Sequence, residues 1–345
     1  MQKKQLCALL PDEIASLLDD AALYRGKQIF QWIHAHLVDN FDSMTNLPKD
    51  MRNRLIDSFC ITNSKLGKIY AKEDSAEKAE ILLEDSNIIE TVLLEDGKGR
   101  KTACLSSQVG CAMGCSFCKT GSLGFARNLS AEEIVSQWLF LKKRYPELSH
   151  IVFMGMGEPL LNLENLKRAV EIITNPAGAG ISKRHITVST CGIVPGIMDI
   201  AEKGPDIRLA VSLITVIPEK RELIMPISKK YPPDDIKEAL TFFQYKKNKR
   251  VTLEIVLIDG LTDTKEDMDM LVRFSRGLSV MVNLIPWNPI EGMDYKSPSE
   301  ENIERFKDYL EKKGLAVTVR HRKGRSINGA CGQLGKVIKR PYSQK

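Results

Sequence analysis

The 345-residue chain lacks several features that would assign it to a particular class of protein. It has no run of apolar residues approaching the roughly 18 needed to span a bilayer, so no membrane association is expected. Its N-terminus leads into polar sequence without an extended apolar core, which argues against a secretory signal. There is no internal repeat and no low-complexity stretch. A hydrophobic content of 43% and a charged content of 27% therefore predict a globular, cytoplasmic protein.

Acidic residues are absent from the last tenth of the chain. From Gly314 to Lys345 there is no Asp or Glu, and eight Lys and Arg residues outweigh the net charge of +6 of the whole chain. These residues are Arg320, Arg322, Lys323, Arg325, Lys336, Lys339, Arg340 and Lys345. Such a segment is typical of a surface that binds a polyanion, with RNA the obvious candidate. A solvated tail that aids solubility explains the charge equally well.

The most informative motif consists of Cys111, Cys115 and Cys118. It lacks a fourth metal ligand nearby, because no Cys or His follows it closely. Three thiolates spaced Cys-x3-Cys-x2-Cys can bind one face of an iron-sulfur cube, whereas a closed cluster or a structural zinc site needs a fourth ligand. The spacing indicates a [4Fe-4S] cluster with one open iron, where substrate chemistry can occur. A zinc knuckle with a distant fourth ligand, or a chance group of cysteines, is the alternative.

The hydrophobic pattern divides the chain into four parts. Residues 1–62 have helical periodicity and predict a small accessory domain, and residues 63–99 predict a β-hairpin extension. Residues 100–320 alternate strands with helices, and residues 321–345 form the basic C-terminal segment. Six strands are expected at 102–106, 150–154, 185–189, 207–212, 252–258 and 281–285. The expected fold is α/β, a partial (β/α)6 barrel that carries the helical domain and the hairpin.

Four unusual segments each follow one of these expected strands. Because catalytic groups in parallel barrels gather at the carboxyl ends of the strands, they predict a single site. Each segment alone is a weak signal, since Gly and Pro after a strand usually mark only a turn. The segments are the cysteine triad, Gly155–Pro159, Thr190–Gly192 and Pro286–Pro289.

Longer motifs resemble the RlmN/Cfr family of radical S-adenosylmethionine (SAM) methyltransferases, which methylate adenosine in RNA. The resemblance covers nearly the whole chain, and Pro159 and Trp287 are more similar to RlmN than to Cfr. It implies a barrel of the radical SAM type, a [4Fe-4S] cluster on the triad and SAM on the open iron. The matching stretches are Tyr24–Trp32, Met44–Leu47, Cys104–Cys111, Gly121–Leu129, Met154–Leu161, Asn283–Pro289 and Ala330–Leu334.

The resemblance also implies a reaction that consumes two SAM molecules per turnover. One SAM would methylate Cys331, and a second would be cleaved at the cluster to a radical that activates this methyl group. After the methylene radical adds to an adenine carbon, Glu90 would accept a proton and Cys104 would release the product through a transient disulfide with Cys331. The family's SAM contacts correspond to Gly157, Glu158, Ser189, Ser212, Leu213, Ile214 and Asn288.

Each implied role has a simpler competitor. Cys331 and Cys104 could be small packed residues, and Glu90 on a hairpin strand would ordinarily lie on a solvated face. Cys7, Cys60 and Cys191 have no implied role and are expected at ordinary packing or surface positions. Among other functions, a methylthiotransferase would need a second cluster. A zinc-binding RNA-recognition protein would leave the Gly155–Pro159 segment unexplained.

Three departures from the family pattern lie near the expected substrate. Ile214 stands where the family commonly has His, Ser326 and Asn328 replace two carboxylates, and Cys191 replaces a usual Ser or Ala. The resemblance implies methylation of adenosine in 23S rRNA, tRNA or both, with carbon 2 favoured over carbon 8. The departures leave the RNA and the carbon open. An electron donor such as flavodoxin or ferredoxin is implied as a further partner, and a monomer is expected.

Overall fold

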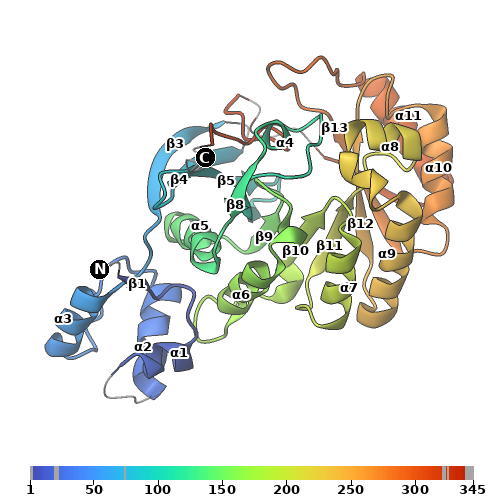
Figure 1. Ribbon diagram of the computed structural model, residues 1–345. Helices are drawn as coiled ribbons and strands as arrows, with labels where there is room; N and C mark the ends of the chain where they lie inside the picture. Colours follow the sequence, from blue (N-terminus) through green and yellow to red (C-terminus); the bar gives the residue numbers. More distant parts are fainter. Residues whose placement is uncertain (1–2, 19–22, 74, 321–323, 325, 339–345) are drawn as a thin grey trace, which may run out of the picture.

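The centre of the protein is a single ten-stranded sheet, seen in a computed structural model that describes residues 3–18, 23–73, 75–320, 324 and 326–338 (Figure 1). Its strands are β3 (Lys65–Glu73), β4 (Ala76–Leu82), β5 (Ile88–Glu95), β6 (Lys101–Cys104), β9 (His150–Phe153), β10 (Ile186–Thr190), β11 (Arg208–Ser212), β12 (Val251–Leu257), β13 (Val280–Pro286) and β14 (Ala316–Val319). The order across the sheet is β14-β13-β12-β11-β10-β9-β6-β5-β4-β3. The seven strands from β6 to β14 are parallel, and β5, β4 and β3 continue the sheet antiparallel.

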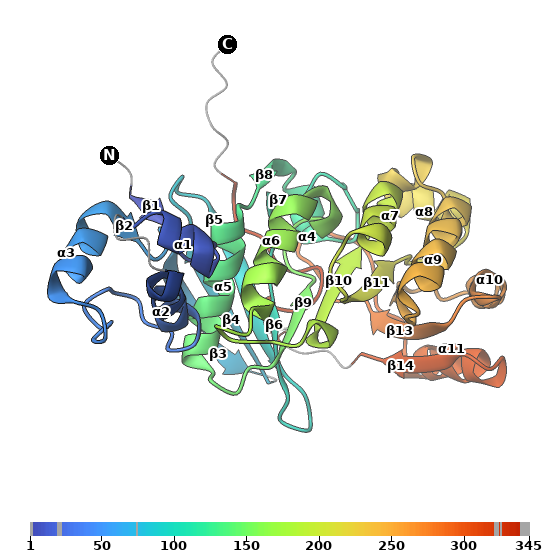
Figure 2. The ribbon, with the colours of Figure 1, turned by 90° about the horizontal axis from the view of Figure 1, so that it is seen from below.

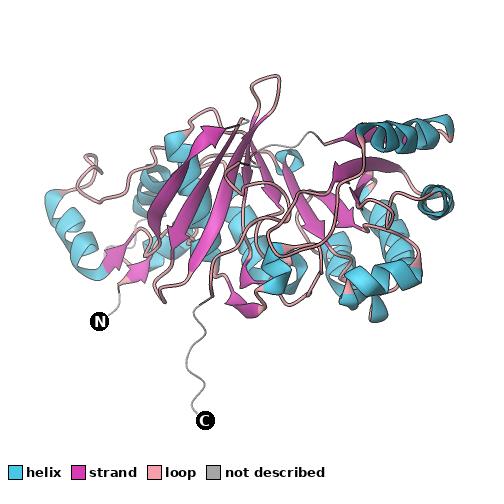
Figure 3. Cartoon of the chain, turned by 90° about the horizontal axis from the view of Figure 1, so that it is seen from above, coloured by secondary structure: helices cyan, strands magenta, loops and turns pink. Residues whose placement is uncertain are grey.

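Helices cover one face of this sheet. Figure 2 shows helices in a row along the parallel strands, and Figure 3 shows the strands from the opposite side. The helices after β6 are α4 (Lys119–Ser122), α5 (Ala131–Arg144), α6 (Leu163–Thr174), α7 (Val194–Glu202), α8 (Pro218–Ile224), α9 (Pro233–Lys247), α10 (Lys265–Ser275) and α11 (Glu300–Lys312), with one-turn helices η1 (Pro159–Leu161), η2 (Lys183–His185) and η3 (Pro226–Lys229). No helix among the described residues is long and apolar enough to cross a membrane.

The N-terminal part forms the expected helical unit, with α1 (Pro11–Ser16), α2 (Leu23–His34) and α3 (Lys49–Ser58). Ile29, Phe30 and Ile33 of α2 are fully buried, as their helical spacing predicts. Their contacts join one continuous apolar core that extends across the main sheet. A two-residue parallel pair, β1 (Lys4–Gln5) with β2 (Phe59–Cys60), closes this unit and is too short to be read from a periodic pattern.

The α/β fold with parallel strands is confirmed, and two details differ from the sequence-based expectation. A seventh parallel strand, β14, pairs with β13; its alternating exposure and four-residue length give little signal. The hairpin of β4 and β5 is joined by β3, and β5 pairs with β6. The extension is therefore continuous with the barrel sheet.

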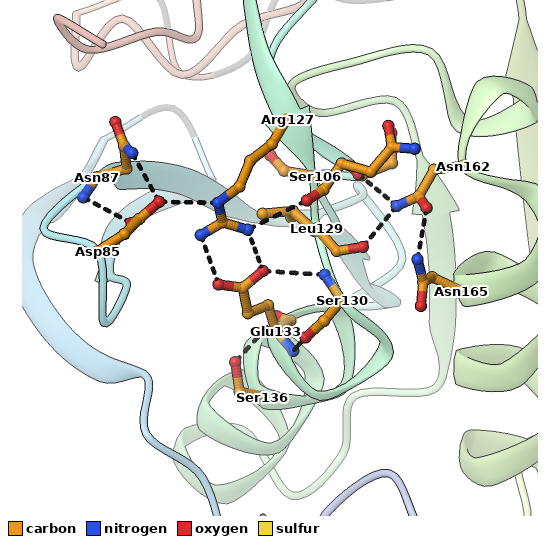
Figure 4. A network of polar contacts seen from close by, with 12 residues as sticks. Asp85, Asn87, Ser106, Arg127, Leu129, Ser130, Glu133, Ser136, Asn162 and Asn165 are labelled. Atoms are coloured by element: carbon orange, nitrogen blue, oxygen red, sulfur yellow. Dashed lines mark hydrogen bonds and ion pairs between the residues drawn. The ribbon is translucent and has the colours of Figure 1, made fainter. Parts of the chain in front are cut away.

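A polar network fixes the entry to α5 beside this junction (Figure 4). Arg127 donates through Nε to Asp85 in the β4–β5 turn at 2.8 Å and through two further nitrogens to Glu133 at 2.7 and 2.8 Å. Glu133 also accepts from the backbone of Ser130, whose hydroxyl caps the helix in return. The network joins the hairpin, the strand β8 (Phe125–Asn128) and α5 into one support.

Asn162 ties the loops of the same region together (Figure 4). Its side-chain nitrogen donates to the carbonyls of Ser107 at 2.8 Å and Leu129 at 2.7 Å, and the residue is buried. Ser107 directly precedes β7 (Gln108–Gly110), which leads into the cysteine motif. We therefore expect Asn162 to hold the approach to that motif.

Replacing Asn162 with Ala should destabilise the protein by roughly 1–3 kcal/mol, because the Leu129 carbonyl loses its side-chain donor while the Ser107 carbonyl retains the Leu129 amide. Asn165→Ala is the matched control, since Asn165 is half-buried and only donates to the Asn162 side chain at 2.8 Å. Thermal unfolding of the two anaerobically purified variants measures the difference. Equal losses in both would contradict this role of Asn162.

Candidate active site

The loop that carries the three cysteines is held by segments from distant parts of the chain. The Ser116 amide donates to the carbonyl of Ile224 in α8 at 3.0 Å, and the Trp287 indole donates to the carbonyl of Phe117 at 3.1 Å. The Lys119 amide donates to the carbonyl of Gly332 at 2.8 Å. The loop thus has contacts with α8, with the segment after β13 and with the C-terminal segment.

A cavity of about 170 Å³ opens at the carboxyl ends of the parallel strands and contains all three cysteines. Its remaining walls come from the ends of strands β9 to β14 and from the C-terminal segment. The predicted site residues that line it are Cys111, Cys115, Cys118, Gly157, Glu158, Ser189, Ser212, Ile214, Asn288 and Cys331. Leu213 is fully buried and is not among the lining residues.

The backbone at Gly157 packs closely against the Gln108 side chain. Gly157 has φ of +99°, and a Cβ there would lie 2.5 Å from the Gln108 side chain. Gln108 in turn accepts a hydrogen bond from the Glu158 amide at 2.9 Å. Only glycine fits this position, which sets the start of the Glu158 side chain.

Glu158 is buried, and its carboxylate is fixed by the backbone. One oxygen accepts from the Leu160 amide at 3.0 Å and the other from the Cys191 amide at 2.8 Å. Burial raises the pKa of this carboxyl group, and the hydrogen bonds oppose the rise. The carboxylate is thus positioned to accept from a cationic group in the cavity.

The three thiols lie in surroundings of low polarity. Burial raises the pKa of Cys111 to about 12 and also raises the pKa values of Cys115 and Cys118. A bound metal centre would reverse this by stabilising the thiolates. Among the described residues no group of three His, Cys, Asp or Glu side chains is placed to hold a single metal ion, whereas in a cube each thiolate binds its own iron.

The cavity also offers polar atoms that lack protein partners. Asn288 donates through Nδ2 to the Cys331 carbonyl at 3.1 Å, but its buried Oδ1 has no hydrogen-bond partner. The hydroxyls of Ser189 and Ser212 lie 3.4 Å apart on adjacent strands. These groups, with the Glu158 carboxylate, fit a ligand that carries an ammonium group and hydroxyls.

A second cavity, of about 600 Å³, adjoins the first. Cys104 at the end of β6 lines it, and Cys331, Asn288 and Arg320 line both cavities. Burial raises the pKa of Cys104 to about 12, a negative charge on Cys331 would raise it further, and the Arg320 guanidinium lowers it. The two thiols therefore share one electrostatic environment.

Glu90 lines neither cavity. It is 1% exposed and pairs with the ammonium group of Lys78 at 3.0 Å, while its other oxygen accepts from the Gly335 amide at 2.7 Å. Lys78 also donates to the carbonyl of Asn328 at 3.2 Å. Glu90 therefore holds the C-terminal segment against the antiparallel strands, and the expectation of a solvated face is wrong.

Comparison with known proteins gives matches over both parts of the chain. Residues 105–274 match the radical SAM superfamily, and residues 18–61 match the ribosomal RNA large subunit methyltransferase N-terminal domain. The "probable dual-specificity RNA methyltransferase RlmN" of Treponema denticola is 47% identical over 98% of this chain and 97% of its own length. The chain belongs to the RlmN family of radical SAM RNA methyltransferases. Its cofactors are therefore a [4Fe-4S] cluster and SAM.

Further relatives agree with this membership. The "dual-specificity RNA methyltransferase RlmN" of Pelobacter propionicus is 41% identical over 90% of this chain and 89% of its own length. A solved radical SAM methyltransferase from Sphaerobacter thermophilus superposes with a TM-score of 0.93, at 38% identity, over 96% of this chain and 99% of that one. Membership of this family excludes the alternative that the chain is a zinc-binding RNA-recognition protein.

Two residues of the site, Glu254 and Arg320, were not found by sequence reasoning, and a third, Cys191, had no implied role. Cys191 was expected at an ordinary packing or surface position, although its segment Thr190–Gly192 was expected at the rim; it lines the cavity of the triad, as does Glu254. Glu254 is a carboxylate inside the apolar strand β12, which is itself a usable signal. Arg320 was counted in the basic tail, although it follows β14 at the same rim as the other segments.

The basic residues between Gly314 and Lys345 lie mostly outside the described residues. Of the eight, only Arg320 and Lys336 lie in the described part of the chain; Arg320 lines the cavities and Lys336 pairs with Glu80 at 2.8 Å.

All eight cysteines are free thiols, so the transient disulfide of Cys104 and Cys331 is not present in this structure.

Glu254 provides a test of the electrostatics at the site. Burial raises the pKa of its carboxyl group, opposed by Arg320 and by a 2.7 Å hydrogen bond from Asn283. Because the folded pKa lies above the unfolded one, this group should cost stability as pH rises through the folded pKa. Glu254→Gln, which mimics the neutral form, should therefore raise the unfolding temperature at pH 8 and leave it nearly unchanged at pH 4. Melting curves at both pH values check this, and a variant that is less stable at pH 8 would contradict the assigned sign.

Proposed function

We propose that this protein methylates carbon 2 of an adenosine in 23S rRNA, tRNA or both, with Cys331 as an intermediate methyl carrier. The observation that carries the proposal is the position of Cys331, which lines both the cavity of the triad and the cavity of Cys104. A methyl group on its sulfur would be accessible to the cofactors in the first cavity and to the RNA substrate in the second. The second cavity, of about 600 Å³, is in the size range of small-ligand sites.

The residues of the first cavity would hold the cofactors. We assign Cys111, Cys115 and Cys118 to the cluster, and Gly157, Glu158, Ser189, Ser212, Ile214 and Asn288 to SAM. When bound, these cofactors supply the methyl groups and the one-electron chemistry. Ile214 has a φ of +65° and its amide donates to the carbonyl of Glu254 at 3.2 Å, so this position acts through its backbone and needs no polar side chain.

Cys331 and Cys104 would act in sequence. Methylation of Cys331 requires its thiolate, and the cationic Arg320 lines the same two cavities as Cys331. After transfer, the RNA is bonded to the Cys331 sulfur through the new carbon. The adduct would give up one electron to the bound cofactors and the proton on the substituted carbon to a base. The Cys104 thiolate then attacks the Cys331 sulfur, so that the S–S bond forms as the S–C bond breaks, and the released carbon takes a proton from solvent to become the methyl group. The disulfide is returned to thiols by a dithiol reductant.

Glu90 is the proposed acceptor of the proton on the substituted carbon. In the present arrangement its carboxylate is occupied by Lys78 and by the Gly335 amide. The role therefore requires residues around Gly335 to leave Glu90 before the adenine reaches it.

The choice of carbon 2, of the RNA and of the partners rests on the family. The relatives named above are RlmN enzymes, and Pro159 and Trp287 are more similar to RlmN than to Cfr. A cytoplasmic monomer that receives electrons from a flavodoxin or a ferredoxin completes the proposal. Carbon-8 methylation is the second candidate, because Ile214, Ser326 and Asn328 depart from the family pattern.

Nucleoside analysis tests the proposal directly. Anaerobic enzyme with a reconstituted cluster, SAM and a low-potential reductant should convert adenosine to 2-methyladenosine in unmodified 23S rRNA or tRNA fragments. Mass spectrometry with authentic standards distinguishes this product from 8-methyladenosine. Exclusive 8-methyladenosine would reject the carbon assignment, and no methylation of either RNA by cluster-loaded enzyme would reject the substrate class.

Replacing Cys104 with Ala should trap the RNA on the protein, because the sulfur of Cys331 then has no neighbouring thiol to release it. A covalent RNA–protein band should appear in denaturing gels, and peptide mapping should assign it to Cys331. Cys60→Ala is the control, since Cys60 lies in the N-terminal pair β1–β2. Multiple turnovers by the Cys104 variant at the unmodified rate would remove Cys104 from the reaction.

A further inference from the structure

One buried cation near the cysteine loop has no anionic partner. Arg221 of α8 is 0% exposed and is among the largest fully buried side chains. Its guanidinium donates to three carbonyls: Cys191 at 2.6 Å, Leu213 at 3.1 Å and, weakly, Tyr231 at 3.4 Å. No carboxylate among the described residues forms an ion pair with it. Fully buried arginine is rare without a paired anion, because the charge loses its hydration.

Three neutral carbonyls satisfy hydrogen bonds but leave the positive charge uncompensated. A neutral donor such as Gln would tie the same loops together at a lower desolvation cost. The Glu158 carboxylate does not pair with Arg221 but accepts from the Cys191 amide, whereas Arg221 donates to the Cys191 carbonyl. Tethering alone therefore does not explain why this position carries a charge.

The contacts of Arg221 reach the wall of the cavity that contains the cysteine loop. Cys191, whose carbonyl accepts from Arg221 at 2.6 Å, lines that cavity together with Cys115. The amide of Ser116, next to Cys115, also bonds to α8 at Ile224, so the helix and the loop form one packed unit. Of the two thiols, Cys115 belongs to the metal-binding triad and becomes a lasting thiolate once iron is bound.

We propose that Arg221 is a positioning residue whose counter-anion is the iron-sulfur cluster itself, and that its charge raises the reduction potential of the cluster. Adding one electron makes the cluster more negative by one unit. A fixed cation in a region of low polarity stabilises that added charge more than an exposed cation does. Cluster potentials are set by net charge, hydrogen bonds and solvent exposure, and Arg221 acts through the first of these. This role goes beyond the proposed substrate and product and depends only on the presence of the cluster.

The test is the midpoint potential of the cluster, measured by anaerobic redox titration with electron paramagnetic resonance in the absence of SAM. Arg221→Gln removes the charge and keeps a hydrogen-bond donor, whereas Arg221→Lys keeps the charge and loses the planar guanidinium with its several donors. At a fixed potential, Gln should leave roughly tenfold less cluster reduced, which for a one-electron couple is a shift of about 59 mV to lower potential. Lys should stay close to the unaltered protein.

Lys246→Gln is the control for net charge, because Lys246 is an exposed cation near the end of α9. Solvent and salt screen its charge, so its loss should not move the potential. Iron and sulfide analysis of every sample identifies those that carry a full cluster. A loaded Arg221→Gln protein with the unaltered potential would overturn the proposal.

Variants that fold but lose the cluster are also decisive, with folding followed by circular dichroism. Retention by Arg221→Lys and loss by both Arg221→Gln and Arg221→Met would support the proposal, because only the charge distinguishes these outcomes. Loss of the cluster by the Lys variant as well would overturn it and leave Arg221 as a tether between loops. Absence of iron from the unaltered protein would instead contradict the cluster site. Failure of the Arg221 proposal can therefore be distinguished from failure of the cluster assignment.

Discussion

The parallel pairing of seven strands is the constraint on which the site depends. Register pairs Cys104 with Val152 on β9 and, at the other edge, Leu284 with Val319. Each strand ends at the same rim, so the segments that follow residues as distant as Cys104 and Val319 open toward shared cavities. The intervening helices make this possible, because a parallel connection needs a crossover that carries the chain back to the starting edge. A change of register at one strand would move a wall of the site and not only its own side chains.

The described residues of the C-terminal segment are held at the rim by individual hydrogen bonds and not by strand pairing. Its backbone receives bonds from Thr120 at Leu334, 2.6 Å, and from Asn288 at Cys331, 3.1 Å, and its Gly335 amide binds Glu90. A segment held this way can leave and return more easily than a strand inside a sheet, since each bond to a side chain can be exchanged for one to water. This suits the role proposed for Cys331, which would meet a cofactor on one side and an RNA on the other.

How much of this could be predicted from the sequence depended on whether the signal was local. Cys111, Cys115 and Cys118 could be predicted as one group because their spacing is a local signal, and Glu158 and Asn288 lie in segments that follow strand ends located by periodicity. Cys331, Cys104 and Glu90 came only from the family resemblance, because their proximity depends on how the chain returns. Leu213 was carried over from the same resemblance and lines neither cavity. Arg221 and Arg320 were missed because a buried arginine and a surface arginine look the same in a sequence, and only packing separates them.

Three buried charged residues near the rim, one of them predicted and two missed, share a physical feature that links cofactor binding to the stability of the fold. Glu158, Glu254 and Arg221 are all buried at the rim, and burial works against the charged form of each. Such groups destabilise a protein unless a partner of opposite charge is present. A ligand that supplies the partner binds the folded chain and not the unfolded one, and so stabilises it by mass action. On the proposals above, the rim would be one half of an electrostatic arrangement, in which the cluster would supply an anion for Arg221 and SAM a cation for Glu158. The charges that are costly in the protein alone would then be those that select these ligands.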